Sequence, residues 1–242
     1  CETAGWSYAG AGVTALSGCM GKVLFRRIME SHGLPMVAWA PYRRGDLARA
    51  YDEWSDRLPV FVKPARLGSS VGITRVHRGD AFMPALESAA GFDPKILVEK
   101  AVQEAREIEV SVLGEESGIS AAVPGEILPG REWYDYEAKY DCPESRLVIP
   151  AELPEETVQK LRRLACMAFA SVDGFGFARV DFLLSQGGDV FINEINTIPG
   201  FTSISMFHRL WEAAGVPVTE LMNRILRAGL ARPEVGLSKD SR

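Results

Sequence analysis

Residues 177–196, FARVDFLLSQGGDVFINEIN, most constrain the fold, because they contain two alternating apolar runs separated by Gly187 and Gly188. A glycine pair between two such runs is typical of a β-hairpin with a two-residue turn. The turn then fixes the register of the hairpin, with Gln186 expected to pair with Asp189.

This register predicts a polar cluster on one face of the hairpin. Asp181 would lie opposite Glu194, and Arg179 opposite Asn196, with all four side chains on the same face. Directly opposed Cβ atoms lie about 4.5–5.5 Å apart, so two carboxylates in these positions repel each other unless a cation lies between them. Oxygen ligands without His or Cys suit magnesium, so we expect a magnesium ion between Asp181 and Glu194 to relieve this repulsion. The alternative is a solvent-facing pair of strands whose acids point into water.

Residues 60–76, VFVKPARLGSSVGITRV, predict two strands joined by a flexible loop. The loop contains Gly68, Ser69, Ser70 and Gly72 and is rich in backbone N–H donors, which could bind phosphate. Lys63 on the first strand could add a positive charge. The alternative is an ordinary glycine-rich hairpin. Gly21-Lys22 lacks the other residues of a Walker A motif, so this chain is not expected to be a P-loop protein.

The remaining pattern predicts an α+β chain, because strands occur in groups between long helices rather than in regular alternation with them. We expect helices at 19–32, 154–172, 207–214 and 218–231, and further strands at 96–99 and 107–113. The polar tail 233–242 is expected to fray.

Composition argues against two classes of partner. The net charge of −5 gives no overall positive field for nucleic acid. No stretch approaches the roughly 18 apolar residues of a membrane span, and no lysine or arginine precedes Lys22 to form the basic segment of a signal peptide. We therefore expect no nucleic acid, no membrane and a cytoplasmic location.

Several motifs, in order, resemble one known family. They are KPARLGSSVGITRV, EKAVQEAREIEVSVLG, PGEILPGREWYDYEAKY, GFARVDFLL and NEINTIPGFTSISM. Together they resemble the D-alanine–D-alanine ligases of the ATP-grasp superfamily, from about Gly5 to about Leu230. This resemblance implies two subdomains that clasp ATP between two sheets. Its expected divisions are a remnant of the N-terminal domain with a linker at 1–20, a central subdomain at 21–99 and a C-terminal domain at 100–232.

The resemblance also implies residue roles in binding ATP and magnesium. Lys22 and Lys63 would contact the α- and β-phosphates, Lys139 would reach the γ-phosphate, and the loop with Ser69 and Ser70 would close over the triphosphate. Glu99, Lys100 and the backbone of Val102 would line the adenine, and Glu107 would bind the ribose. Asp181, Glu194 and Asn196 match the ligands of magnesium, which is expected as two ions and could be replaced by manganese.

Further roles concern the reaction itself. Arg179 and the N–H of Gly200 would stabilise an oxyanion. Ser205 and Met206 match positions that hold the carboxylate of the second substrate. Tyr140 would bond toward Ser69 to order the lid, and it favours D-alanine over D-lactate as the acceptor.

The implied activity is the ligation of two D-alanines through an acyl phosphate, for peptidoglycan precursor synthesis. The resemblance leaves the family's N-terminal domain without a counterpart here, including the glutamate that would hold the first D-alanine. The family usually has an acid at the position of Gly21. The alternatives are a D-alanine–D-serine or D-alanine–D-lactate ligase, and an ATP-binding fragment without ligase activity. A homodimer is possible.

Overall fold

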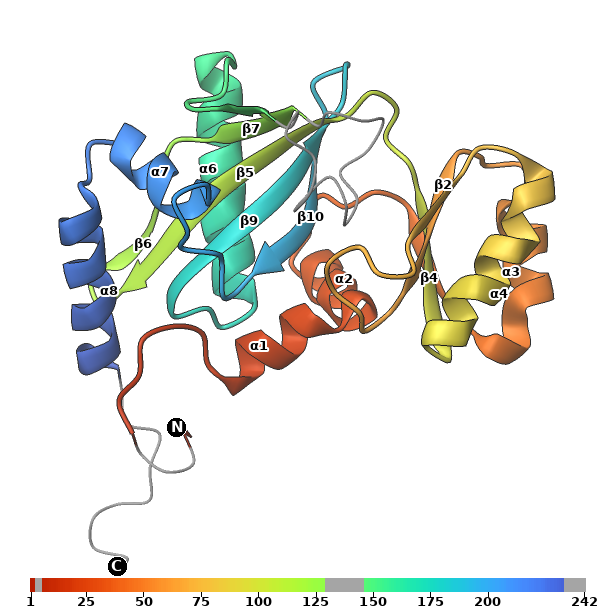
Figure 1. Cartoon of the computed structure of the whole chain (residues 1–242), viewed down its shortest axis with the longest axis horizontal. Coiled ribbons are helices and arrows are strands. Elements are labelled where there is room, and N and C mark those ends of the chain that lie inside the picture. The colour runs from red at the N-terminus through yellow and green to blue at the C-terminus, as the bar shows by residue number, and fades with distance from the viewer. Residues whose placement is uncertain (3–5, 129–145, 233–242) are drawn as a thin grey trace, which may run out of the picture.

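Two antiparallel β-sheets organise the described part of the chain, with helices packed against each (Figure 1). The structure is a computed structural model that describes residues 1–2, 6–128 and 146–232. This arrangement of helices and antiparallel sheets confirms the predicted α+β class. In the described ranges, no helix has the length and apolar character needed to cross a bilayer.

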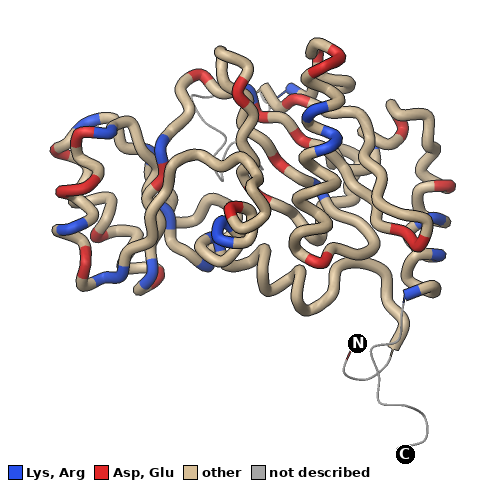
Figure 2. Tube along the Cα trace, turned by 180° about the vertical axis from the view of Figure 1, so that it is seen from behind, with Lys and Arg blue, Asp and Glu red and all other residues tan. Residues whose placement is uncertain are grey.

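The smaller sheet has four strands in the order β1-β4-β2-β3. Its strands are β1 (Trp39–Arg43), β2 (Val60–Pro64), β3 (Thr74–Val76) and β4 (Lys95–Lys100). Helices α3 (Leu47–Trp54) and α4 (Phe82–Phe92) pack on it, each preceded by a short 3-10 helix, η2 (Arg44–Asp46) or η3 (Gly79–Ala81). Figure 2 shows basic and acidic residues interspersed around this sheet and its helices, which is the pattern of a solvated surface.

The larger sheet has six strands, in the order β10-β9-β5-β7-β8 with β6 also paired to β5. Its strands are β5 (Arg106–Glu115), β6 (Gly118–Ala121), β7 (Gly125–Leu128), β8 (Arg146–Val148), β9 (Gly176–Leu184) and β10 (Val190–Asn196). The helices around it are α1 (Val13–Met20), α2 (Lys22–Ser31), α6 (Glu155–Ser171), α7 (Met206–Ala213) and α8 (Val218–Ala231).

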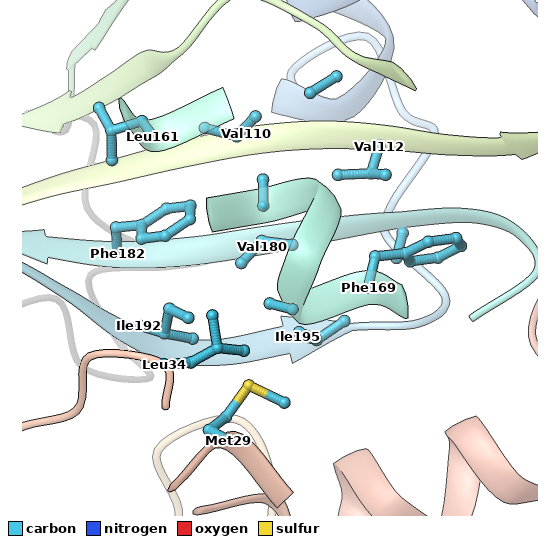
Figure 3. Close-up of a cluster of buried hydrophobic side chains, with 14 of the residues drawn as sticks. Met29, Leu34, Val110, Val112, Leu161, Phe169, Val180, Phe182, Ile192 and Ile195 are labelled. Carbon is cyan, nitrogen blue, oxygen red and sulfur yellow. The ribbon is translucent and has the colours of Figure 1, made fainter. Parts of the chain in front are cut away.

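One face of the larger sheet is apolar along the three strands shown in Figure 3. Residues from β5, β9 and β10 pack there against α6 and against Met29 of α2; the labelled strand residues are Val110, Val112, Val180, Phe182, Ile192 and Ile195. Since alternate residues of a strand face opposite ways, the residues between them point to the other face. At one end that other face is covered by α7 and α8, and at the other end it carries polar side chains.

The turn of the predicted hairpin differs from the expected two-residue turn. Ser185, not Gln186, pairs with Asp189, since the N–H of Ser185 donates to the Asp189 carbonyl at 2.9 Å. The loop therefore has three residues, and Gly188 adopts a left-handed conformation with φ of 85° that closes it. The predicted pairing of Gln186 with Asp189 is wrong by one residue.

A β-bulge at Asn193 shifts the register by one residue, so the pairs beyond it are the ones that the sequence predicted. The register shifts between Ile192 and Glu194, so one extra residue is inserted in β10. Beyond the bulge Asp181 lies opposite Glu194, and the predicted pairing of Arg179 with Asn196 also forms.

Four helices differ from the sequence prediction. The range 19–32, expected to be one helix, contains the last two residues of α1 and all of α2, because Gly21 has an extended conformation and separates them. Helices α3 and α4 lie in segments for which no helix was predicted. The buried residues of α3 are only Ala50 and Trp54 among many charged ones, which is too sparse an apolar pattern to recognise.

Candidate active site

Three carboxylates form a row across the polar face of the larger sheet. Asp181 on β9 is paired with Glu194 on β10 and with Glu109 on β5, so it is the middle member. Arg179 lies beside this row and donates to both oxygens of Asp181, from Nε at 2.7 Å and from Nη2 at 2.8 Å. The same Nε is 3.1 Å from Oε2 of Glu109. A single guanidinium therefore contacts two of the three acids.

Burial strengthens this arrangement, because the side chains of Arg179 and Asp181 are only 17% and 15% exposed. Burial opposes the charge of Arg179, yet its pKa is raised above the usual arginine value. The acids cause this rise, with Asp181 contributing most, followed by Glu109 and then Glu194. All three carboxylates thus act electrostatically on one guanidinium.

The next row of the same face is Asn196, Arg179 and Ser111, on β10, β9 and β5. Ser111 is fully buried, and its hydroxyl donates to the carbonyl of Phe207 in α7 at 2.9 Å. This bond fastens the start of α7 to the polar face.

The predicted magnesium ligands Asp181, Glu194 and Asn196 are brought together on this face, and their oxygens match what a hard divalent cation prefers. Among the described residues, no group of three or more His, Cys, Asp and Glu side chains is arranged to hold a metal ion. The predicted set has two acids and one amide, and both oxygens of Asp181 accept hydrogen bonds from Arg179. A cation here would have to share Asp181 with that arginine, and the ligand set stays a prediction.

A buried ion cluster lies on the smaller sheet. Glu99 of β4 is 3% exposed and forms ion pairs with Arg26 of α2 through one oxygen and with Lys63 of β2 through the other. Register places Lys63 beside Leu97 and Phe61 beside Glu99. Val23 of α2 packs against Leu97 in a small apolar cluster that holds the helix to this sheet.

Lys63 connects the two sheets electrostatically. Burial lowers its pKa well below the usual lysine value, and the positive charges of Arg26 and Lys22 lower it further. Glu194 of β10 and Glu107 of β5 oppose this shift. Lys63 thus lies within electrostatic reach of acids of the larger sheet.

The predicted phosphate loop follows directly from Lys63 and β2. Lys22 Nζ donates to the carbonyl of Leu67, and its backbone N–H donates to Ala65 at 2.9 Å, so the start of α2 lies against this loop. Ser69 and Ser70 both have left-handed φ angles, 51° and 60°, within two successive turns. Such conformations are unfavourable for residues other than glycine and are often found at ligand-binding loops.

The base of the loop is anchored by an ion pair. Arg66 donates to both oxygens of Asp93, at 2.9 and 2.8 Å, and the Asp93 carboxylate also accepts from the N–H of Lys95. These bonds lower the pKa of Asp93. Ser69 itself is exposed.

The predicted adenine-binding residues lie where the chain passes from one sheet to the other. Lys100 ends β4, and its Nζ donates to the carbonyls of Arg57 and Leu58 at 2.6 and 3.2 Å. Val102 follows it in the connection to β5, and Glu107 is the second residue of β5. Their roles stay predictions.

The predicted substrate-binding segment lies between β10 and α7. A Cβ added to Gly200 would lie 2.8 Å from Oγ of Ser205, so these two residues meet closely. The Ser205 hydroxyl accepts from the N–H of Thr202 at 2.9 Å and lies 2.8 Å from its hydroxyl. Met206 is buried in the apolar core beneath α7, so it can offer a ligand only its backbone. Lys139 and Tyr140 lie outside the described residues.

Two charged residues of the site were missed in the sequence. Glu109 continues the alternation Glu107, Glu109, Ser111 on one face of β5. This alternation predicts the face on which Glu109 lies, but not which residues of other strands it meets. Arg26 lies midway between the buried residues Val23 and Met29 of α2, and a charge on the apolar side of a helix was the available signal.

Comparisons with known proteins agree on one family. Residues 28–227 match the family described as D-ala D-ala ligase C-terminus. The chain is 45% identical over 238 residues to the D-alanine–D-alanine ligase of Heliobacterium modesticaldum, covering 96% of this chain and 64% of that protein. The chain therefore spans about two thirds of the length of the curated relatives it matches.

Solved structures give the same result. The D-alanine–D-alanine ligase from Coxiella burnetii superimposes with a TM-score of 0.82 at 33% identity, covering 93% of this chain and 61% of that one. VanG D-Ala:D-Ser ligase from Enterococcus faecalis also has a TM-score of 0.82, at 27% identity, covering 91% of this chain and 64% of that one.

Proposed function

Because the chain belongs to the D-alanine–D-alanine ligase family by its match to that family's C-terminal region, we propose that it forms the ATP-grasp part of an enzyme that joins two D-alanines. One observation carries the proposal. The acids Asp181 and Glu194 are directly opposed on the larger sheet, while Lys63 of the smaller sheet lies within electrostatic reach of Glu194. In a magnesium–triphosphate complex, acidic side chains bind the metal and basic side chains bind the phosphates, so both must lie close together.

The smaller sheet would bind the phosphates. Lys63 is fixed by its ion pair with Glu99, and Lys22 is fixed against the loop that contains Ser69 and Ser70. In the proposed complex these two lysines lie beside the α- and β-phosphates, and the left-handed serines present the loop to the triphosphate. Burial of Lys63 favours this role, because it disfavours the charged ammonium and a phosphate anion would add negative charge to that of Glu99.

The connection between the sheets would bind the nucleoside. Glu99, Lys100 and Val102 are close in sequence at the end of β4, and Glu107 follows at the start of β5. In this proposal the adenine lies against the first three residues and the ribose bonds to Glu107. Because this segment joins the two sheets, the nucleotide would lie between them.

The larger sheet would hold the divalent cation. Asp181, Glu194 and Asn196 supply hard oxygen donors on half-buried strands, which fit Mg²⁺ or Mn²⁺. When bound, the metal would neutralise charge on the transferring phosphoryl group.

The proposed chemistry has two steps. A carboxylate oxygen of the first D-alanine attacks the γ-phosphorus of ATP, the bond to the bridging oxygen breaks, and ADP leaves. The amine of the second D-alanine then attacks the acyl phosphate carbon, loses a proton and displaces inorganic phosphate. Arg179 and the N–H of Gly200 would stabilise the negative oxygen that forms in this second step, while Ser205 and the backbone of Met206 hold the second carboxylate.

Phosphate release from ATP by the purified protein, as its gene encodes it, tests the proposal. We expect release that requires Mg²⁺ and is stimulated by D-alanine but not by L-alanine, with D-alanyl-D-alanine detected by mass spectrometry. D-serine and D-lactate are tested as second substrates beside D-alanine, since a D-Ala:D-Ser ligase has the same fold. Binding of ATP without stimulation by any D-substrate would contradict the ligase assignment.

A further inference from the structure

Glu109 is the member of the carboxylate row that has no role in the proposed function. It lies on β5, in the middle of the larger sheet, and is only 5% exposed. Its Oε2 is 3.1 Å from Nε of Arg179, and its strand partner on β9 is Asp181. Burying a carboxylate is costly unless a partner compensates it, so its position beside Arg179 needs a reason.

The row has two different ends. On one side Asp181 faces Glu194, and this pair of opposed acids is the place for a cation. On the other side Asp181 faces Glu109, and Arg179 contacts both of these acids. Asp181 is therefore next to the proposed cation position, through Glu194, and also next to the Arg179 guanidinium that it shares with Glu109.

This dual position creates a conflict when a cation binds. Both oxygens of Asp181 accept hydrogen bonds from Arg179. A divalent ion that coordinates Asp181 takes lone pairs that the guanidinium now uses, and a largely buried arginine without an anionic partner is strongly unfavourable. A second acid within reach of the same Nε removes most of that cost.

We propose that Glu109 is a positioning residue that holds Arg179 in place when a divalent cation takes the oxygens of Asp181. The inference rests on the proposed function, since it requires a cation at Asp181 and Glu194. Glu109 acts through Arg179 in two ways. It weakens the hold of Arg179 on Asp181 before the cation binds, and it keeps the guanidinium at the reaction site afterwards.

Manganese affinity tests this role without any turnover. Mn²⁺ binding is measured by electron paramagnetic resonance on the protein as its gene encodes it, with a non-hydrolysable ATP analogue present. Glu109→Gln removes one of the two carboxylates that contact Arg179 and leaves Asp181. We expect Mn²⁺ to bind this variant about tenfold more weakly, as for other residues that orient metal ligands. Glu109→Asp keeps the charge but shortens the reach by one methylene, and we expect it to lose most of the same affinity.

Glu115→Gln is the matched control. Glu115 lies at the other end of β5 and pairs with Arg224 of α8, away from the carboxylate row. Its substitution removes one negative charge from the same strand and should leave Mn²⁺ affinity unchanged. Thermal unfolding is measured for every variant, and if Glu109→Gln does not fold, Glu109→Asp carries the test.

The outcomes separate the two proposals. Wild-type affinity in both Glu109 variants would overturn the positioning role and leave the metal site intact. Weak binding by Glu109→Gln with wild-type binding by Glu109→Asp would also overturn it, because charge alone would then explain the effect. If the wild-type protein binds no Mn²⁺ with the analogue, the metal site of the proposed function fails, and this inference fails with it.

Discussion

In the smaller sheet the buried carboxylate of Glu99 has two cationic partners, whereas in the larger sheet three carboxylates lie in a row beside Arg179. The first group is a set of buried ion pairs, since the side chains of Arg26 and Glu99 are 2% and 3% exposed. The second group has three acids around one arginine, two of the acids are opposed across neighbouring strands, and Glu194 also acts on Lys63.

This difference suggests different roles for the two groups of charged residues, one in stability and one in function. A set of buried ion pairs stabilises the fold only while every partner is present, because the loss of one leaves a desolvated charge. Acids that are directly opposed on neighbouring strands repel each other, and a cation bound between them reduces this repulsion. We therefore expect substitution of Arg26 in the Glu99 group to change mainly stability, and substitutions in the carboxylate row to change nucleotide chemistry.

The largest effect on stability is expected from Arg26→Met. Removing the guanidinium leaves Glu99 with Lys63 as its partner in a buried place, so we expect a loss of about 3 kcal/mol in the free energy of unfolding, at the lower end for a broken buried pair. Urea unfolding followed by circular dichroism measures it. Arg26→Lys keeps the charge and should recover most of the loss. A change below about 0.5 kcal/mol in Arg26→Met would show that the Glu99 group does not stabilise the fold.

A large effect on activity with little effect on stability is expected from Glu194→Gln. Removal of one of two opposed acids should lower Mg²⁺-dependent phosphate release by about 100-fold or more, which corresponds to about 2.7 kcal/mol of transition-state stabilisation. The free energy of unfolding should change by less than about 1 kcal/mol, because repulsion from Asp181 is lost together with attraction to nearby cations.

Asp189→Asn is the control for this prediction. Asp189 is an exposed acid at the turn of the same hairpin, so the substitution makes the same change from acid to amide without touching the row. It should leave phosphate release unchanged. Retained activity in Glu194→Gln would contradict the metal site on the hairpin.

The hairpin shows how far the sequence alone determines the site. Alternation and the glycine pair predict both strands and the meeting of Asp181 with Glu194, because these depend on residues close in the chain. The predicted turn was wrong by one residue, and the pairing is correct only because the bulge at Asn193 restores the register. A bulge leaves little trace in an alternating pattern, so the sequence could not predict it.

Contacts between distant segments were not predictable in the same way. Glu109 meets Asp181 because β5 pairs with β9, about 70 residues later, and no local pattern sets that register. Arg26 meets Glu99 because α2 packs against the smaller sheet. The fold class followed from the grouping of strands and helices, whereas the roles of Lys22, Ser205 and the other binding residues depend on resemblance to the family.

The smallest expected effect concerns Lys63, which belongs to the Glu99 group but is proposed to serve the nucleotide. Its pKa lies well below the usual lysine value because of burial and the charges of Arg26 and Lys22. A lysine with a lowered pKa loses its proton at a lower pH, and phosphate binding favours the protonated form. Affinity for ATP should therefore be highest below the pKa of the unliganded protein and should fall as the pH rises through it. We expect a fall of about threefold from neutral to alkaline pH, equivalent to about 0.65 kcal/mol.

Lys63→Arg tests the cause of this fall, because arginine stays charged throughout the range and can keep an ion pair with Glu99. Isothermal titration calorimetry of both proteins in the same buffers cancels the ionisation of ATP itself. The variant should bind ATP with little dependence on pH, even if its affinity at neutral pH is lower. If both proteins lose affinity equally, titration of Lys63 is not the cause. The lysine would then be only a structural partner of Glu99, and the functional role in this comparison would lie with the larger sheet alone.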